Sequence, residues 1–278
     1  MIALTAAQIA EAVSGTLSAT LDPATVLVHV TPDSREVTAE GTLYVAKPGE
    51  RADGHDFIDA ALGAGAAAVL AERATHAPDG AAHPAILVED AVLAMGALAR
   101  EVVRRVREHS PTTVIGITGS AGKTTTKDLL AALLATQGPT VAPVGSYNGE
   151  VGVPLTVFRA ELDTRFLVVE MGADHVGNIA YLCDIVRPDI GVVLMVGTAH
   201  AGSFGGVANI ARTKGELVEA LGPDGVAVLN LDDERVAGMA ARTAAPITWF
   251  TADERGVARA AEDGAARRGA GLVPAPGV

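Results

Sequence analysis

The residues best suited to chemistry lie in the stretch GSAGKTT. An apolar run precedes it and a run with helical spacing follows, which is the setting of a phosphate-binding loop. Its glycines allow backbone N–H groups to converge on an anion at a helix N-terminus. Lys123 could reach the terminal phosphates of a nucleotide, and the Thr124 hydroxyl could bind Mg²⁺. The predicted nucleotide-binding residues of this phosphate loop are Gly119, Ser120, Ala121, Gly122, Lys123, Thr124 and Thr125.

The phosphate loop departs from the usual Walker A spacing. That pattern has a glycine five positions before Gly122, and Ile117 stands there instead. A tight strand–helix turn with an exposed lysine is the alternative interpretation. Gly-Lys-Thr between a strand and a helix favours phosphate binding, but it does not say which reaction follows.

Three further side chains could act beside the phosphate loop. Glu170 ends an apolar run, where its carboxylate could hold Mg²⁺ on a nucleotide. His200 follows another apolar run, and Lys214 lies in the helical pattern after it. Taken alone, these residues would be a solvated strand end, a loop histidine and a surface lysine.

Polar residues also gather in two segments of the first 90 residues, PDSREV and KPGERADGHDFI. Arginine side chains on loops suit an anionic ligand, because the guanidinium group binds phosphate in a fixed fork. Two ordinary polar turns would explain the same residues, and the chemistry leaves both interpretations open. The candidate substrate-binding residues are Ser34, Arg35, Arg51, Asp53, Gly54 and His55.

The elements that must position these residues follow an α/β pattern. Residues 1–90 contain an expected strand at 41–46 and an alanine-rich helix at 56–68, and we expect them to form a small substrate-binding domain. In residues 91–278, nearly continuous Val, Ile and Leu runs alternate with helices, which indicates a mostly parallel sheet. The expected strands of this nucleotide-binding domain are TTVIGIT, RFLVVEMG, DIGVVLMVG and GVAVLNLDD. Ligands of such sheets bind beyond the carboxyl ends of the strands, where the candidate residues fall.

Composition excludes several classes of protein. The chain has 278 residues and a formal net charge of −12, which argues against non-specific nucleic-acid binding. Its single cysteine, Cys183, excludes an internal disulfide and a cysteine-rich metal site. The sequence has no signal-peptide pattern at its start and no apolar run of about 20 residues. We therefore expect a cytoplasmic protein without membrane insertion.

Together these motifs resemble the Mur ligases of peptidoglycan synthesis. The family's phosphate loop has the shorter form Gly-x-x-Gly-Lys-Thr, here GSAGKT, and the resemblance extends through YNGEVGVPLTVFR, VVEMGADHVGNIA and HAGSFGGVANIARTKGEL. It implies that Thr124, Glu170 and His200 bind magnesium ions. It also implies that Lys214 is carbamylated and helps to bind a second Mg²⁺. Asn148 joins the implied substrate-binding residues, although Gly149 stands where the family often has a second asparagine.

The resemblance implies a reaction in two steps. ATP phosphorylates the carboxylate of UDP-N-acetylmuramoyl-tripeptide, and the amine of D-alanyl-D-alanine then attacks the acyl phosphate. Two alternatives are a family member that adds a different amino acid and a non-catalytic nucleotide-binding remnant. The family's C-terminal Rossmann-like domain has no counterpart here, so we expect a truncated chain, monomeric and with little activity alone.

Overall fold

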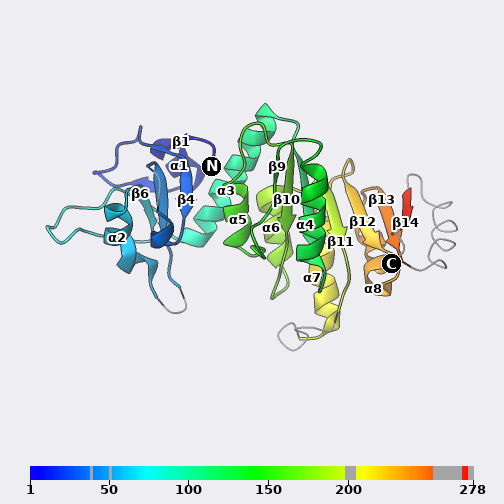
Figure 1. Ribbon diagram of the computed structural model, residues 1–278. Helices are drawn as coiled ribbons and strands as arrows, with labels where there is room; N and C mark the ends of the chain where they lie inside the picture. Colours follow the sequence, from blue (N-terminus) through cyan, green and yellow to red (C-terminus); the bar gives the residue numbers. More distant parts are fainter. Residues whose placement is uncertain (38–39, 50–51, 198–204, 253–270, 275–278) are drawn as a thin grey trace. The chain divides into compact units, whose positions relative to one another are not determined.

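The computed structural model describes residues 1–37, 40–49, 52–197, 205–252 and 271–274. It divides into two compact units (Figure 1): Met1–His109 with Val157–Leu162, and Ser110–Thr156 with Asp163–Val278. The first unit extends beyond the boundary that we predicted near residue 90. Helix α3 (Ala91–His109) packs against α1 (Ala6–Ala12) and buries Met95, Leu98 and Val102, so it belongs to the first unit.

A five-stranded sheet forms the centre of the first unit. Its neighbouring strands are, in order, β2 (Thr16–Leu17), β7 (Ala85–Leu87), β6 (Ala66–Ala71), β5 (Thr42–Ala46) and β4 (His29–Thr31). Only the β2–β7 pair is antiparallel. A separate antiparallel pair joins β1 (Leu4–Thr5) to β3 (Val26–Leu27). The predicted strand at 41–46 is thus confirmed as β5.

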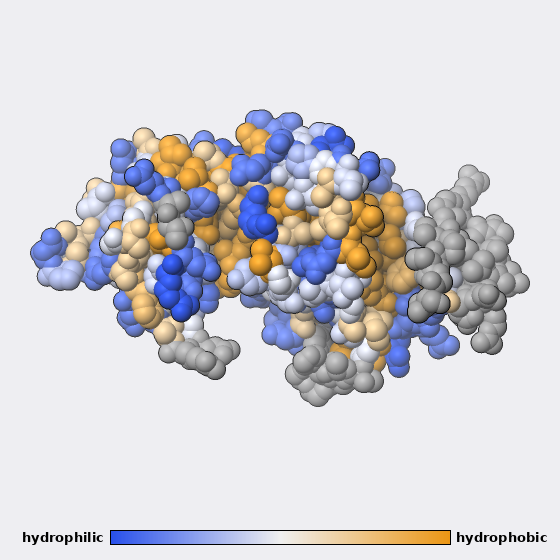
Figure 2. Space-filling model, viewed as in Figure 1, coloured by the Kyte–Doolittle hydropathy of each residue, from blue (hydrophilic) through white to orange (hydrophobic). Residues whose placement is uncertain are grey.

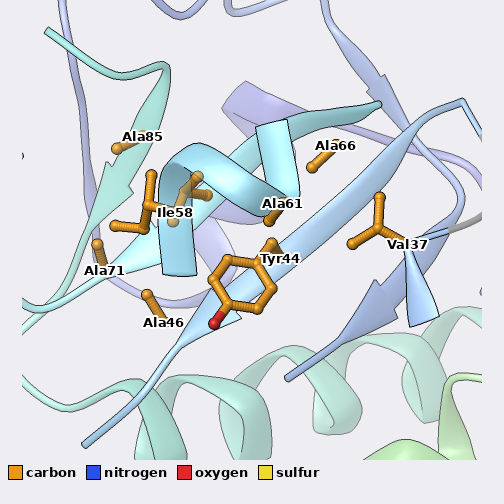
Figure 3. Close-up of a cluster of buried hydrophobic side chains, with 9 residues drawn as sticks. Val37, Tyr44, Ala46, Ile58, Ala61, Ala66, Ala71 and Ala85 are labelled. Atoms are coloured by element: carbon orange, nitrogen blue, oxygen red, sulfur yellow. The ribbon is translucent and has the colours of Figure 1, made fainter. Parts of the chain in front are cut away.

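Small side chains let α2 (Ile58–Gly63) pack closely on this sheet. Ile58 and Ala61 of α2 lie over Tyr44 of β5 (Figure 3). Two valines, Val37 and Val69, and alanines from β5, β6 and β7 complete the cluster. The helix predicted at 56–68 is shorter than expected. It follows the short 3-10 helices η1 (Ser34–Glu36) and η2 (Gly54–Phe57) and ends before Gly65, after which the chain enters β6.

The second unit is built on a seven-stranded sheet in which all neighbouring strands are parallel. The order is β14 (Gly271–Pro274), β13 (Ile247–Thr251), β12 (Val226–Asn230), β11 (Ile190–Val193), β8 (Thr113–Thr118), β10 (Phe166–Glu170) and β9 (Thr140–Val141). The predicted parallel α/β sheet is confirmed, and its four predicted strands are β8, β10, β11 and β12. Strands β13 and β14, which pair with each other, lie beyond the four predicted strands.

Helices cover both faces of this sheet. On one face, Leu130 and Leu134 of α4 (Lys123–Leu134) pack against Ile115 and Val168. The outer side of α4 carries the exposed Leu129 and Leu133, and Figure 2 shows apolar surface where this helix lies. The remaining helices are α5 (Gly152–Val157), α6 (Asn178–Val186), α7 (Val207–Glu219), α8 (Glu234–Gly238) and the 3-10 helix η3 (Met239–Arg242). Within the described ranges, no helix combines the length and the apolar character needed to cross a membrane.

Helix α7 approaches the opposite face of the sheet over two glycines. Gly116 of β8 and Gly191 of β11 are direct partners in the parallel register. A Cβ atom at Gly116 would lie 3.0 Å from Leu217 Cδ1, and one at Gly191 would lie 3.1 Å from Leu217 Cγ. The missing side chains therefore set how closely α7, which carries Lys214, can approach the sheet.

Candidate nucleotide-binding site

The phosphate loop connects β8 to α4 at the carboxyl edge of the seven-stranded sheet. Its position agrees with the expected setting, since β8 lies between β10 and β11, where the strand order reverses. Gly122 adopts a left-handed φ of 82° at the start of α4, a conformation that favours glycine, and no side chain caps the helix. Lys123 Nζ donates to Gly119 O at 3.0 Å, which keeps the ammonium group over the loop.

The loop offers groups that suit a phosphate. The first-turn N–H groups of α4 receive no cap from its N-cap residue, and the helix dipole adds positive potential there. The Ser120 hydroxyl oxygen is buried and lacks a hydrogen-bond partner among the described residues. Ser120 N donates to Met195 O at 2.9 Å, which fastens the loop to the chain after β11. An anion with several acceptor oxygens fits this set of donors.

Glu170 ends β10, and its carboxylate accepts hydrogen bonds from Thr124 and Asn148 beside the phosphate loop. Its side chain is 1% exposed. Glu170 Oε2 accepts a hydrogen bond from Thr124 Oγ1 at 3.0 Å, and Oε1 accepts one from Asn148 Nδ2 at 2.8 Å. The Thr124 hydroxyl also lies 3.1 Å from Ser146 Oγ.

This donor set fits Mg²⁺ bound to a nucleotide. Carboxylate and hydroxyl oxygens are the hard ligands that Mg²⁺ prefers, and such an ion usually takes only one or two protein ligands besides phosphate and water. No group of three or more His, Cys, Asp and Glu side chains suited to a metal occurs among the described residues.

Lys214 is buried on α7 and electrostatically linked to the phosphate loop. Burial, together with a smaller contribution from the positive charge of Lys123, lowers the pKa of its ammonium group to about 8. Glu216 holds the same helix in place, because its carboxylate accepts hydrogen bonds from Gly177 N at 2.7 Å and Ala180 N at 3.0 Å at the start of α6. Lys214 is therefore not the surface lysine of the alternative interpretation.

The chain after β11 is held by residues at the end of β12. Asn230 Nδ2 donates to Leu194 O at 2.9 Å, and Asp233 Oδ2 accepts from Val196 N at 2.7 Å. The predicted site residue His200 lies outside the described residues. The phosphate loop and Glu170 were predicted to lie at one edge of the sheet; they do so because parallel strands carry them, and Asn230 ends a strand of the same sheet.

A separate cavity of about 410 Å³ lies in the first unit. Its lining residues are Pro32, Asp33, Ser34, Arg35, Tyr44, Lys47, Gly49, Ala52, Gly54 and Phe57. Ser34, Arg35 and Gly54 were predicted from the sequence. A hydrogen bond from Arg35 lowers the pKa of Asp33 to about 2, so this carboxylate stays ionised. The sequence interpretation missed Lys47 and the exposed ring of Phe57.

Three other predicted substrate-binding residues, Asp53, His55 and Asn148, are absent from this lining. His55 is buried: its Nδ1 lies 2.6 Å from Asp53 Oδ1, and its Nε2 accepts from Glu72 N at 3.1 Å. Asp53 also pairs with Arg73 at 2.8 Å. Asp53 and His55 therefore stabilise the start of η2 and link it to Glu72 and Arg73. Asn148 lies in the second unit, where its side-chain amide donates to Glu170. Arg51 is outside the described residues.

Comparisons with known proteins agree with this architecture. Residues 117–268 match the Mur ligase middle domain, and residues 27–103 match the model described as Mur ligase family, catalytic domain. Because the first match covers more than half of the chain, the protein belongs to the Mur ligase family.

The similar proteins narrow the resemblance further. The chain is 46% identical over 275 residues to the UDP-N-acetylmuramoyl-tripeptide–D-alanyl-D-alanine ligase of Mycobacterium tuberculosis, covering 92% of this chain and 54% of the relative. It is 38% identical over 236 residues to the protein of the same name from Escherichia coli, covering 84% and 49%. The chain thus spans about half the length of the curated relatives it matches.

Two solved structures share the fold. MurF from Acinetobacter baumannii superimposes with a TM-score of 0.81 at 32% identity, covering 91% of this chain and 55% of that one. MurF ligase from Thermotoga maritima, in complex with ADP, gives 0.70 at 38% identity, covering 81% and 50%. The relatives with the same architecture therefore include one that binds a nucleotide.

Proposed function

We propose that this chain supplies the nucleotide site and the UDP-binding site of an ATP-dependent ligase. The enzyme would join D-alanyl-D-alanine to UDP-N-acetylmuramoyl-tripeptide. The observation that carries the proposal is the convergence of the phosphate loop, the Glu170 carboxylate and the buried Lys214 in one unit. The names of the relatives support the choice of substrates over those of a ligase for a different amino acid.

The geometry supports phosphoryl transfer at the phosphate loop. Its N–H groups and Lys123 would hold the phosphates of ATP, with Thr124 and Glu170 as ligands of Mg²⁺. When bound, Mg²⁺ would offset negative charge on the transferred group. A carboxylate oxygen of the tripeptide would attack the γ-phosphorus atom, and ADP would leave. The amine nitrogen of D-alanyl-D-alanine would then attack the acyl carbon, expelling phosphate and losing a proton as the amide forms.

Carbamylation of Lys214 belongs to the same proposal. An amine must be unprotonated to attack CO₂, and the attack forms an N–C bond and releases a proton. With a pKa of about 8, roughly a tenth of the Lys214 side chains carry a neutral amine at pH 7. The resulting carbamate would be an anion near Lys123, placed to bind a second Mg²⁺.

The cavity of the first unit suits the UDP end of the substrate. Arg35 and Lys47 could contact the diphosphate, and the exposed ring of Phe57 could stack on uracil. The two cations share the cavity with Asp33, which orients Arg35 through a 2.6 Å ion pair.

Calorimetry with MgATP tests the nucleotide site. Lys123→Ala is expected to abolish measurable binding, since it removes the charge that the loop places beside the terminal phosphates. Lys47→Ala, in the other unit, is the matched control and should bind MgATP like the wild type. Equal binding by wild type and Lys123→Ala would show that the nucleotide lies elsewhere, and absence of binding to the wild type would contradict the proposal.

A further inference from the structure

Lys127 is a buried cation that the proposed chemistry does not use. It lies one turn after Lys123 on α4, and its side chain is only 2% exposed. Its ammonium group donates to Pro143 O at 3.0 Å and to Gly145 O at 3.2 Å, and it pairs with Asp128 Oδ1 at 2.6 Å. An ammonium group has three N–H donors, so these partners can occupy all of them. Lys127 thus has no donor to spare for a phosphate.

The backbone that Lys127 holds leads directly to the candidate metal ligands. Residues 143–148 lie in the connection between β9 and α5 and include Ser146 and Asn148. Ser146 Oγ lies 3.1 Å from the Thr124 hydroxyl, and Asn148 Nδ2 donates to Glu170 Oε1 at 2.8 Å. One face of this segment is therefore bound by Lys127, and its side chains contact both oxygen ligands proposed for Mg²⁺.

We propose that Lys127 is a positioning residue for the Mg²⁺ site. It holds residues 143–148 against α4, so that Ser146 and Asn148 fix the directions of the Thr124 and Glu170 oxygens. The inference rests on the proposed nucleotide function. Its physical basis is the cost of leaving buried N–H donors without acceptors: if the segment moves away, the ammonium group keeps Asp128 but loses two carbonyl partners where water has little access.

A purely structural lysine would behave differently. Its replacement would loosen the whole unit, or would leave the site as it is. A positioning role predicts a local change: residues 143–148 loosen, and the contribution of Mg²⁺ to nucleotide binding falls while the phosphate loop keeps its own contacts. Partners that orient metal ligands in this way typically affect metal affinity by about 10- to 100-fold.

The test compares wild type with Lys127→Met, which keeps the length of the side chain and removes its charge. ADP affinity is measured by calorimetry with and without Mg²⁺, and amide hydrogen exchange is followed by mass spectrometry. We expect the gain in affinity from Mg²⁺ to fall roughly 10-fold or more. ADP affinity without Mg²⁺ should be unchanged, and exchange should rise in residues 143–148 but not in β8 or β10. Asp128→Asn, which leaves both carbonyl contacts in place, should resemble the wild type.

Several results would overturn the inference. One is an unchanged Mg²⁺ gain in Lys127→Met, and another is faster exchange throughout the sheet with equal losses of both affinities. If Lys127→Met does not fold, Lys127→Gln, which retains a donor, replaces it; failure of both to fold would make Lys127 a general requirement of the unit. A wild type without any Mg²⁺-dependent ADP binding would instead remove the proposed function, and this inference with it.

Discussion

Replacing Lys214 with methionine is expected to stabilise the second unit at neutral pH. The lysine ammonium group is buried near Lys123, and its pKa falls from 10.5 to about 8 on folding. The difference between these two pKa values corresponds to about 3 kcal/mol of free energy that the charged form costs the folded state. Methionine keeps the apolar stem without the charge, so Lys214→Met should recover much of this free energy.

The effect should depend on pH in a defined direction. Below pH 8, Lys214 is protonated in both the folded and the unfolded chain, and the full cost of burial applies. Between pH 8 and about 10.5, the folded lysine loses its proton while the unfolded one keeps it, so wild-type stability rises relative to the variant. Above that range both forms are neutral, and the difference due to charge disappears.

Urea unfolding followed by tryptophan fluorescence measures this difference. Trp249 is the single tryptophan of the chain and is 6% exposed on β13 of the second unit. Buffers must be free of CO₂, so that no carbamate replaces the ammonium group. Lys47→Met, in the first unit, controls for the loss of a lysine and should not move the Trp249 transition. A Lys214→Met variant that is no more stable than wild type at pH 7, or a difference that stays constant up to pH 10.5, would refute the reasoning.

Two further predictions concern the close approach of α7 and the cavity of the first unit. Gly191→Ala should destabilise the second unit by about 1–3 kcal/mol in the same assay, because the new Cβ would meet Leu217 and Leu221 at 3.1–3.2 Å. Gly222→Ala, which meets nothing within 4 Å, is its control, and equal effects of the two would contradict the packing argument. Lys47→Ala should weaken UDP binding by about 1.5–3 kcal/mol in calorimetry, the usual value of a hydrogen bond to a charged group. Arg73→Ala, outside the cavity lining, should leave UDP affinity unchanged, and a UDP affinity independent of Lys47 would place the ligand elsewhere.

The sequence was most informative where local pattern and parallel topology coincide. Apolar runs before the phosphate loop and through Glu170 predicted strands β8 and β10, and parallel strands necessarily bring such carboxyl ends to one edge. Short or mixed strands were missed. Strand β9 has only two residues, and β14 lies in a stretch rich in Gly, Ala and Pro, so neither shows an apolar run of its own.

Side-chain partners that are distant in sequence were harder to predict. Asn148 was assigned to substrate, whereas its amide binds Glu170, and nothing in the local sequence indicates that contact. The burial of Lys127 could have been predicted from its spacing. It lies three and seven residues before Leu130 and Leu134, which places it on the buried face of α4. The polar segments before and after β5 were compatible with an anion-binding site or with two ordinary turns, and they did not indicate which side chains line the cavity.

The most direct test of the central claim is a titration of the isotopically labelled chain with MgADP, followed by amide NMR. The account predicts that the largest shifts occur in the phosphate loop, at Glu170 and in residues 143–148, while the cavity around Arg35 and Lys47 stays unchanged. Subsequent addition of UDP should shift that cavity alone. Shifts from MgADP that fall outside the carboxyl edge of the seven-stranded sheet, or no saturable response at all, would contradict the assignment of this edge as the nucleotide site.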